Sequence, residues 1–160
     1  AGDMDSYIIP FLLDQGLTLD EILKGIDKNG GMLGVSGVSN DLRDIEEAAA
    51  AGNGRAQLAI DVFCESIVKY IGAFYAVLGG LDYLVFTGGI GENSATVRGK
   101  ACRRLAHLGI RLDEAANAAG PKDRVVSPVD SPVKVCIIPT NEEIGIAQDI
   151  QDNFSGHAIG

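Results

Sequence analysis

Two short apolar runs, each followed directly by a polar turn and a helical pattern, constrain the fold of this chain most. Residues 83–87 lead into a glycine-rich turn and then a helical spacing that ends at Gly109. Residues 133–138 lead into a second polar turn, where Thr140 and Glu143 have the capping-box spacing that opens a helix. The first run is too apolar to have a solvent-facing side and is expected inside a sheet. Two strand-to-helix units predict an α/β domain.

Helical periodicity and capping signals predict the remaining elements. Thr18 and Glu21 form a capping box in front of a helix over residues 18–28. Apolar residues at three- and four-residue steps predict a long helix that ends at Gly79. The other expectations are a short strand or an ordered loop over 32–39, a helix over 40–50, a peripheral connection over 110–132 and, within it, a short helix over 113–119.

Charge and composition restrict the partners of the chain. Its 13 Lys and Arg stand against 22 Asp and Glu, so the formal net charge is -9 and a nucleic-acid backbone would be repelled. No apolar run approaches the roughly 20 residues of a membrane helix, and no signal-peptide pattern begins the chain. Three widely spaced cysteines in apolar contexts suit buried free thiols in a reducing compartment. We expect a soluble, cytoplasmic single domain over residues 1–160, with no nucleic-acid or membrane partner.

The first strand-to-helix turn carries the candidate ligand loop. In open α/β sheets, ligands bind beyond the carboxyl ends of the strands. Gly88, Gly89 and Gly91 remove three side chains over four positions, which lets the backbone approach a ligand such as a nucleotide. The alternative is that these glycines only make a sharp turn. The spacing matches neither a Walker loop nor the dinucleotide-binding fingerprint.

Two charged residues are further candidates. Glu142 in the second turn is not used by the capping box and is free to act, although a glutamate in a first helical turn also complements the helix dipole. The guanidinium of Arg43 can stack on a base or bind a ribose or phosphate. The alternative there is a helix start capped by Asn40 or Asp41 with a local ion pair to Arg43. No Ser or Cys has a neighbouring base pattern, so covalent catalysis is not supported.

Four segments in the same order resemble the acetate and propionate kinase family. They are GDMD at residues 2–5, GVSGVSNDLRD at 34–44, FTGGIGENS at 86–94 and IPTNEE at 138–143. Together they cover nearly the whole chain and are similar to the C-terminal half of acetate kinase. The sister propionate kinases share these segments, and butyrate kinases match them less well.

The resemblance implies a single ribonuclease H-like lobe of the actin-like ATPase fold, a mixed sheet flanked by helices. In that family two such lobes close over ATP. The resemblance also implies ATP or ADP as the nucleotide, Mg²⁺ as the metal, acetate or acetyl phosphate as the second substrate, and a homodimer formed through this lobe. The nucleotide-binding residues that it carries over are Asp41, Leu42, Arg43, Gly89, Ile90, Gly91, Glu92 and Asn93, and the residue associated with Mg²⁺ is Glu142.

The resemblance also predicts what these 160 residues lack. The family's arginine that contacts the transferred phosphoryl group would precede Ala1, and the N-terminal lobe with the acetate-binding residues is expected to be absent. Ser6 replaces the usual proline. The complete enzyme would transfer a phosphoryl group reversibly between ATP and acetate, while the isolated chain is expected to be nearly inactive and to contain no catalytic residue. The alternatives are a propionate kinase lobe and a non-catalytic dimerisation module.

Overall fold

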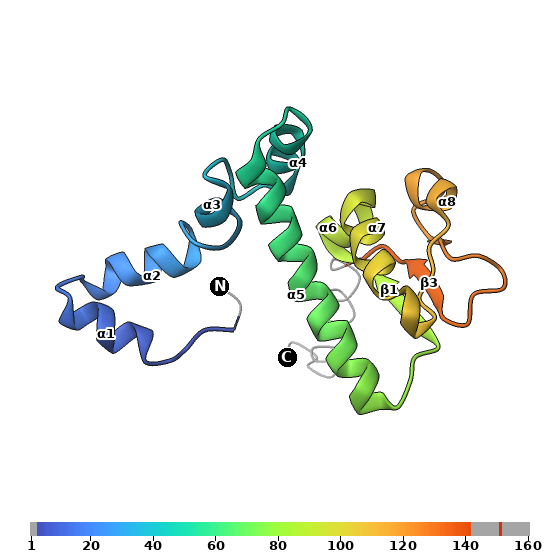
Figure 1. The fold of residues 1–160 in the computed structure, drawn as a ribbon, viewed down its shortest axis with the longest axis horizontal. Coiled ribbons are helices and arrows are strands. Elements are labelled where there is room, and N and C mark those ends of the chain that lie inside the picture. The colour runs from blue at the N-terminus through green and yellow to red at the C-terminus, as the bar shows by residue number, and fades with distance from the viewer. Residues whose placement is uncertain (1–2, 142–150, 152–160) are drawn as a thin grey trace, which may run out of the picture.

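The computed structural model of the chain describes residues 3–141 and 151. Five α-helices come before the first strand in this part of the chain, and three more separate it from the other two strands of a small sheet (Figure 1). In chain order the elements are α1 (Ile8–Asp14), α2 (Leu19–Asp27), α3 (Gly31–Ser36), α4 (Leu42–Ala50), α5 (Gly54–Leu78), β1 (Tyr83–Phe86), α6 (Gly88–Asn93), α7 (Ala95–Arg104), a 3₁₀ turn η1 (Ala106–Leu108), α8 (Glu114–Ala118), β2 (Arg124–Val125) and β3 (Lys134–Ile137).

The sheet of the described chain has three strands in the order β1, β3, β2. β1 runs parallel to β3, with Tyr83 opposite Lys134 and Phe86 opposite Ile137. β2 pairs with the other edge of β3 in the antiparallel direction. The sheet is therefore mixed, and α5 and α7 lie beside it (Figure 1). The predicted α/β class, a mixed sheet flanked by helices, is confirmed.

The buried apolar side chains form two clusters that α5 joins. The first lies between the sheet, α7 and the C-terminal half of α5, and its buried members are Phe86, Cys102, Leu105, Ile110, Val126, Val133, Val135 and Ile137. The second lies between α4, α5 and α7, and its buried members are Leu42, Ile45, Ala56, Ala59, Ile60, Cys64 and Val97. Because α7 contributes to both clusters, packing sets its position relative to α4 and to the sheet.

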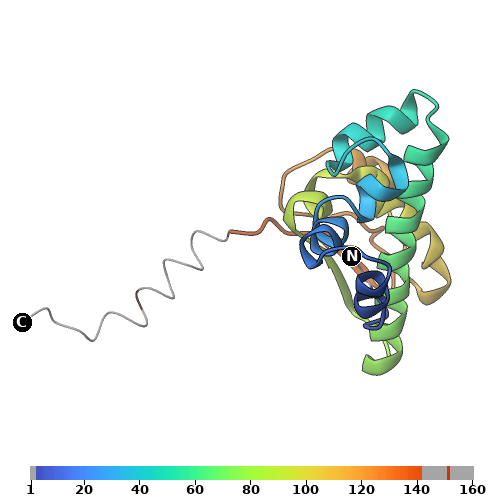
Figure 2. The ribbon, with the colours of Figure 1, turned by 90° about the vertical axis from the view of Figure 1, so that its left-hand side faces the viewer.

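The helices with clear start signals form as predicted. The Thr18 hydroxyl accepts the Glu21 N–H, and the Glu21 carboxylate accepts the Thr18 N–H at 2.8 Å, which completes the capping box of α2. α5 begins after Asn53, whose side chain accepts two backbone N–H groups, and it ends at Gly79 with φ 72°. Figure 2 shows α5 as the long helix of the structure, and it packs against α3, α4 and α7. α4 and α8 also form where the sequence predicts them.

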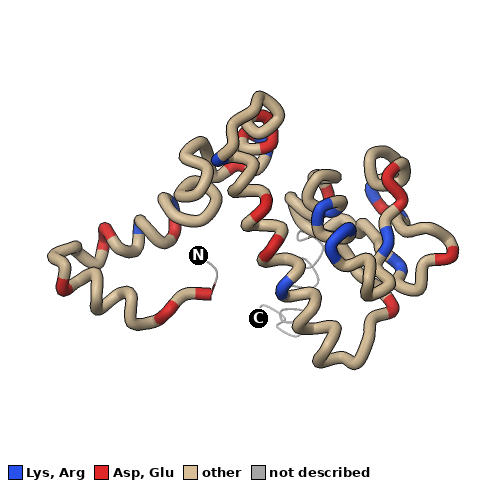
Figure 3. The backbone as a smooth tube through the Cα atoms, viewed as in Figure 1, with Lys and Arg blue, Asp and Glu red and all other residues tan. Residues whose placement is uncertain are grey.

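Ion pairs add to the contact between α5 and α7. Basic residues gather over α7 and acidic residues lie along α5 (Figure 3). Lys100 contacts Asp61 at 2.5 Å, and Arg104 pairs with Glu65. Exposed pairs of this kind each contribute about 0–1 kcal/mol. They supplement the apolar packing between the two helices.

Two glycine-containing segments are helical, which differs from the predictions. Residues 32–39, expected as a strand or an ordered loop, include α3, whose Met32 and Val35 pack against the second cluster at helical spacing. α3 ends at Gly37, where φ is 68°. Residues 88–93, expected as a turn, form one short helix, α6. Glycine is compatible with these helices but does not predict them, because its intrinsic helix propensity is low.

Two predictions of burial are also wrong. β1 is not enclosed: Tyr83 is 63% exposed and Val85 is 44% exposed, while Phe86 on the other face is buried. Successive side chains of a strand point to opposite faces of the sheet, and within the described chain the face that carries Tyr83 and Val85 is not covered. The connection over 110–132 is not peripheral, because Ile110 and Val126 are fully buried and β2 extends the sheet.

The predicted second capping box and its helix lie outside the described residues, as do Glu142 and Glu143. Within residues 3–141, Cys64, Cys102 and Cys136 are buried free thiols, as predicted. In the same part of the chain, no helix has the length and apolar character needed to cross a membrane.

Candidate functional site

A cleft of about 660 Å³ lies between α4 and the α6–α7 junction, beyond the carboxyl end of β1. It joins two segments that are far apart in the sequence. Its lining residues are Asn40, Asp41, Leu42, Arg43, Glu46, Gly89, Ile90, Asn93 and Ser94. The structure therefore brings together six of the eight predicted nucleotide-binding residues.

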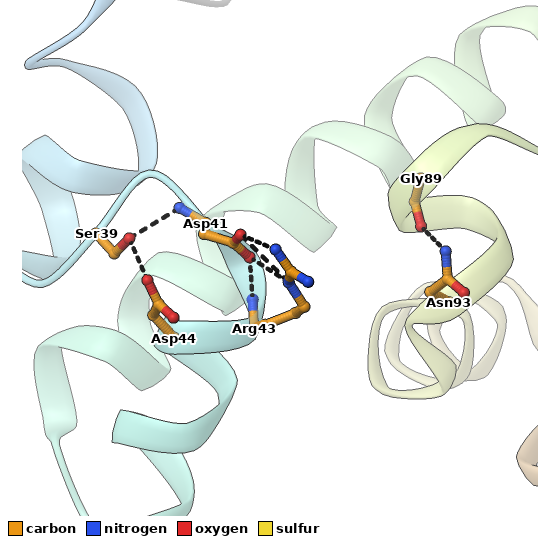
Figure 4. Close-up of polar contacts among 6 residues, drawn as sticks. All are labelled: Ser39, Asp41, Arg43, Asp44, Gly89 and Asn93. Carbon is orange, nitrogen blue, oxygen red and sulfur yellow. Dashed lines mark hydrogen bonds and ion pairs between the residues drawn. The ribbon is translucent and has the colours of Figure 1, made fainter.

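The first wall is the start of α4. The Asp41 carboxylate caps the helix by accepting the Arg43 N–H at 2.9 Å. The same carboxylate accepts the Arg43 guanidinium at 2.5 Å, and these hydrogen bonds lower the pKa of Asp41 to about 2. The Ser39 hydroxyl accepts the Asp41 N–H and donates to Asp44 (Figure 4). The predicted cap and local ion pair are both present.

Arg43 is nevertheless accessible to a ligand. Its side chain is 86% exposed, and in Figure 4 it lies beside Asp41 while Gly89 and Asn93 stand on the separate helix α6. An ion pair this exposed is weakly held, because water screens the attraction and competes for both partners. Arg43 can therefore turn toward a molecule in the cleft at small cost.

The second wall is α6. Its Gly89 has open space where a side chain would stand, and the Asn93 side chain donates to the Gly89 carbonyl oxygen at 2.8 Å. Gly91 serves packing instead: a Cβ there would lie 3.2 Å from the Phe86 carbonyl carbon. The Glu92 side chain hydrogen-bonds to Thr140, in the turn after β3. Neither Gly91 nor Glu92 lines the cleft.

The Glu92 carboxylate links α6 to the turn after β3. Its Oε1 accepts the Thr140 backbone N–H at 3.0 Å and the Thr140 hydroxyl at 3.1 Å. The Thr140 backbone N–H is the main cause that lowers the pKa of Glu92. Glu92 thus connects the two strand-end turns that the sequence singled out. The second of these turns continues into Glu142, which lies outside the described residues.

Two residues that sequence reasoning missed connect the walls. The buried Ser94 hydroxyl donates to the Glu46 carboxylate at 2.6 Å, across the base of the cleft. Ser94 also caps α7 by accepting the Val97 N–H at 3.0 Å. The position of Ser94 just before a helical pattern is a capping signal that the sequence does contain. The sequence does not indicate that Glu46 lines the cleft, because a glutamate within a helix usually faces solvent.

The charge of the cleft favours an uncharged polar ligand group. Its lining has one cation, Arg43, and two carboxylates, Asp41 and Glu46. A group of phosphates in the cleft would be repelled by the carboxylates. A nucleoside fits the lining better, since Ile90 offers an apolar contact and the polar side chains offer hydrogen bonds.

No three His, Cys, Asp or Glu side chains among the described residues gather to hold a metal ion. Mg²⁺ is commonly held by only one or two carboxylates together with nucleotide phosphates. A single carboxylate such as Glu142 is compatible with that donor set.

Comparison with known proteins identifies the family. The sequence model of the acetokinase family matches residues 1–148. The acetate kinase of Geobacillus sp. (strain WCH70) is 48% identical over 151 residues, which are 94% of this chain and 38% of that protein. The solved acetate kinase of Porphyromonas gingivalis has a TM-score of 0.86 at 45% identity and is matched over 95% of this chain and 39% of its own.

A solved propionate kinase from Francisella tularensis is also similar, with a TM-score of 0.84 at 35% identity over 93% of this chain and 38% of its own. The match to the family model covers most of the chain, so the chain belongs to the acetokinase family. It spans about two fifths of the length of the relatives that it matches.

Proposed function

We propose that this chain is the C-terminal nucleotide-binding and dimerisation lobe, of ribonuclease H-like architecture, of an acetate kinase. The complete enzyme transfers a phosphoryl group from ATP to acetate and forms acetyl phosphate and ADP, and it catalyses the reverse reaction. Phosphoryl transfer depends on alignment and charge neutralisation more than on a protein nucleophile. The role of this lobe is therefore to hold the nucleotide, and the isolated chain is expected to turn over little or no substrate.

The observation that carries this proposal is the cleft between α4 and α6. It gathers Asp41, Leu42 and Arg43 with Gly89, Ile90 and Asn93, which are distant in sequence. In the proposed complex the nucleoside occupies the cleft, and Arg43 leaves Asp41 to lie against the base or ribose. The phosphates extend out of the cleft, away from the two carboxylates.

Mg²⁺ would be held by Glu142 together with the phosphates. When bound, the ion neutralises phosphate charge during transfer. Glu92 supports this arrangement, because its hydrogen bonds to Thr140 hold the start of the turn that leads to Glu142.

Acetate is the preferred acceptor in this proposal. The acetate kinases of Geobacillus sp. and Porphyromonas gingivalis are 48% and 45% identical to the chain, whereas the Francisella tularensis propionate kinase, at 35%, is about as similar as the acetate kinase of Entamoeba histolytica, at 34%. Propionate kinase is the alternative. A matched assay of the complete enzyme with acetate and propionate distinguishes the two by their kcat/KM values.

The proposed homodimer rests on exposed apolar side chains of α5. Tyr70, Phe74, Val77 and Leu78 are between 45% and 82% exposed, and α1 buries no residue in the described chain. Monomeric proteins rarely expose a contiguous apolar surface of this kind. Among the described residues, Cys64, Cys102 and Cys136 are free thiols, which suits a reducing, cytoplasmic location.

Calorimetric titration with Mg²⁺ and ADP tests nucleotide binding. The variant Arg43→Ala keeps the backbone N–H that Asp41 caps, so α4 is retained, but it loses the side chain that contacts the nucleotide. We expect the Kd for ADP to rise about tenfold or more. The matched control is Arg111→Ala, which removes another exposed arginine paired with a single aspartate, Asp130, away from the cleft.

Equal affinities of the Arg43→Ala and Arg111→Ala variants would contradict the proposed role of Arg43. Lack of ADP binding by the unmodified chain at millimolar concentration would remove the nucleotide site from this proposal. Dimerisation, measured by analytical ultracentrifugation, would then be the remaining function of the chain.

A further inference from the structure

Arg98 is the largest fully buried side chain of the described residues. It stands on α7 and is 2% exposed. An arginine in a helix usually keeps its charged end in water, because removing that charge from water is costly. A buried guanidinium therefore needs partners, and those partners indicate what the residue does.

The hydrogen-bond partners of Arg98 among the described residues are uncharged oxygen atoms. Nη1 donates to the carbonyl oxygens of Gly91 at 2.7 Å and Glu92 at 2.9 Å. Nε donates to the Asn117 side-chain oxygen at 2.7 Å, and Nη2 donates to the Asn117 carbonyl oxygen at 3.0 Å. The planar guanidinium thus joins α6 to α8 through α7, with a geometry that a lysine cannot reproduce.

The carbonyls of Gly91 and Glu92 belong to the last turn of α6. Carbonyl groups in a last turn lack partners within their helix and carry partial negative charge. The Arg98 guanidinium donates hydrogen bonds to these carbonyl oxygens, and its positive charge lies next to their partial negative charge. Asn117 is held in turn, since its side-chain nitrogen donates to the Ala95 carbonyl oxygen at 2.9 Å.

α6 has little else to hold it in place. It buries no residue and contains three glycines, so apolar packing contributes little to its position. Its other described attachments are the close approach of Gly91 to Phe86 and the exposed link from Glu92 to Thr140. Arg98 is the buried polar attachment of a helix whose opposite side lines the cleft.

We propose that Arg98 is a positioning residue for the cleft: its guanidinium clamps the carbonyls of Gly91 and Glu92 and so fixes the wall formed by Gly89, Ile90 and Asn93. The clamp itself is a property of the ligand-free chain. Its effect on affinity rests on the proposed nucleotide function. The test therefore has one readout for the fixing of α6 and another for the affinity for the nucleotide.

The test compares Arg98→Met and Arg98→Lys with Arg124→Met. Arg124 is a matched control, because its guanidinium donates to the carbonyl oxygens of Ala116, Pro121 and Asn117 and none of these lies in α6. It shares the Asn117 carbonyl oxygen with Arg98, so Arg124→Met also reports the effect of weakening the bonds at Asn117 alone. Arg98→Lys keeps the charge and loses the paired hydrogen bonds. If Arg98→Met does not fold, as judged by circular dichroism, Arg98→Lys decides the outcome.

The first readout is hydrogen exchange of the backbone amides in residues 88–93 of the ligand-free chain. We expect both Arg98 variants to exchange there about tenfold faster or more, with exchange in α4 unchanged. The second readout is the Kd for Mg²⁺-ADP, which should rise about tenfold in the Arg98 variants and remain within about twofold in Arg124→Met.

Exchange in α6 that is no faster in the Arg98 variants than in Arg124→Met would overturn the clamp. Faster exchange with affinities equal to that of Arg124→Met would also overturn the positioning role, since the wall would then move without effect on the ligand. If the unmodified chain binds no ADP, the proposed function fails, and the exchange readout alone decides whether Arg98 fixes α6.

Discussion

Replacing Ser94 with alanine removes two hydrogen bonds at the base of the cleft. The Ser94 side chain is buried, accepts the Val97 N–H at 3.0 Å and donates to the Glu46 carboxylate at 2.6 Å. The change leaves α7 without its cap and Glu46 without its partner from the opposite wall. We expect a loss of stability from both.

The size of this loss follows from the two bonds. Loss of a serine N-cap costs about 1 kcal/mol. Loss of the bond to Glu46 costs about 1 kcal/mol more, which is below the roughly 1.5–3 kcal/mol of a hydrogen bond to a charged group, because water in the cleft replaces part of the interaction. The combined loss of about 2 kcal/mol in the free energy of unfolding lowers the Tm of a chain of this length by about 4–8 °C.

Thermal and urea unfolding followed by circular dichroism measure the effect. The control is Ser66→Ala, which removes an exposed hydroxyl that donates only to the carbonyl oxygen one turn earlier in α5, and it should change stability by less than about 0.5 kcal/mol. A double-mutant cycle of Ser94→Ala with Glu46→Ala should give a coupling of about 1 kcal/mol. A coupling indistinguishable from zero, or a loss no larger than that of Ser66→Ala, would refute this reasoning.

Two further predictions concern the walls of the cleft. The hydrogen bonds from Arg43 lower the pKa of Asp41 from 3.8 to about 2. The contribution of the Asp41 carboxylate to stability is therefore present above pH 3.8 and is lost as the pH falls through about 2. NMR titration of this carboxylate should give the low pKa, and a value near 3.8 would show that its hydrogen bonds to Arg43 do not persist in solution. Gly91→Ala should destabilise the chain by about 1–3 kcal/mol in urea unfolding, because the new Cβ would lie 3.2 Å from a backbone carbon of β1. Gly89→Ala should have no such cost, because no atom lies within 4 Å of the position that its Cβ would take. Equal effects of the two variants would contradict this difference in packing.

Local signals predicted the elements that depend on neighbouring residues. The capping box of Thr18 and Glu21 and the glycine after α5 each act within a few positions along the chain. Their prediction therefore needs no knowledge of the fold. The polar segment after β1 was also located from local signals, although it forms the helix α6 and not a turn.

Predictions that depended on distant contacts were less successful. The apolar residues of β1 suggested two covered faces, but whether a face is covered depends on which elements pack there. Residues 88–93, expected as a turn, form a helix whose Gly91 and Glu92 carbonyl oxygens accept hydrogen bonds from Arg98 and whose Gly91 lies against the backbone of Phe86. Glycine content alone favours a turn at such a position.

The sequence by itself determined the acetokinase family, the α/β class and the positions of the main helices and strands, because motifs, caps and periodicity are written over short stretches of chain. Only the tertiary structure decided which predicted residues share a cleft and which serve packing. It separated Gly89, which lines the cleft, from Gly91, which packs on β1. It also revealed the burial of Arg98 and the bond between Glu46 and Ser94. Burial and partners depend on contacts between segments far apart in the chain, and no local pattern encodes them.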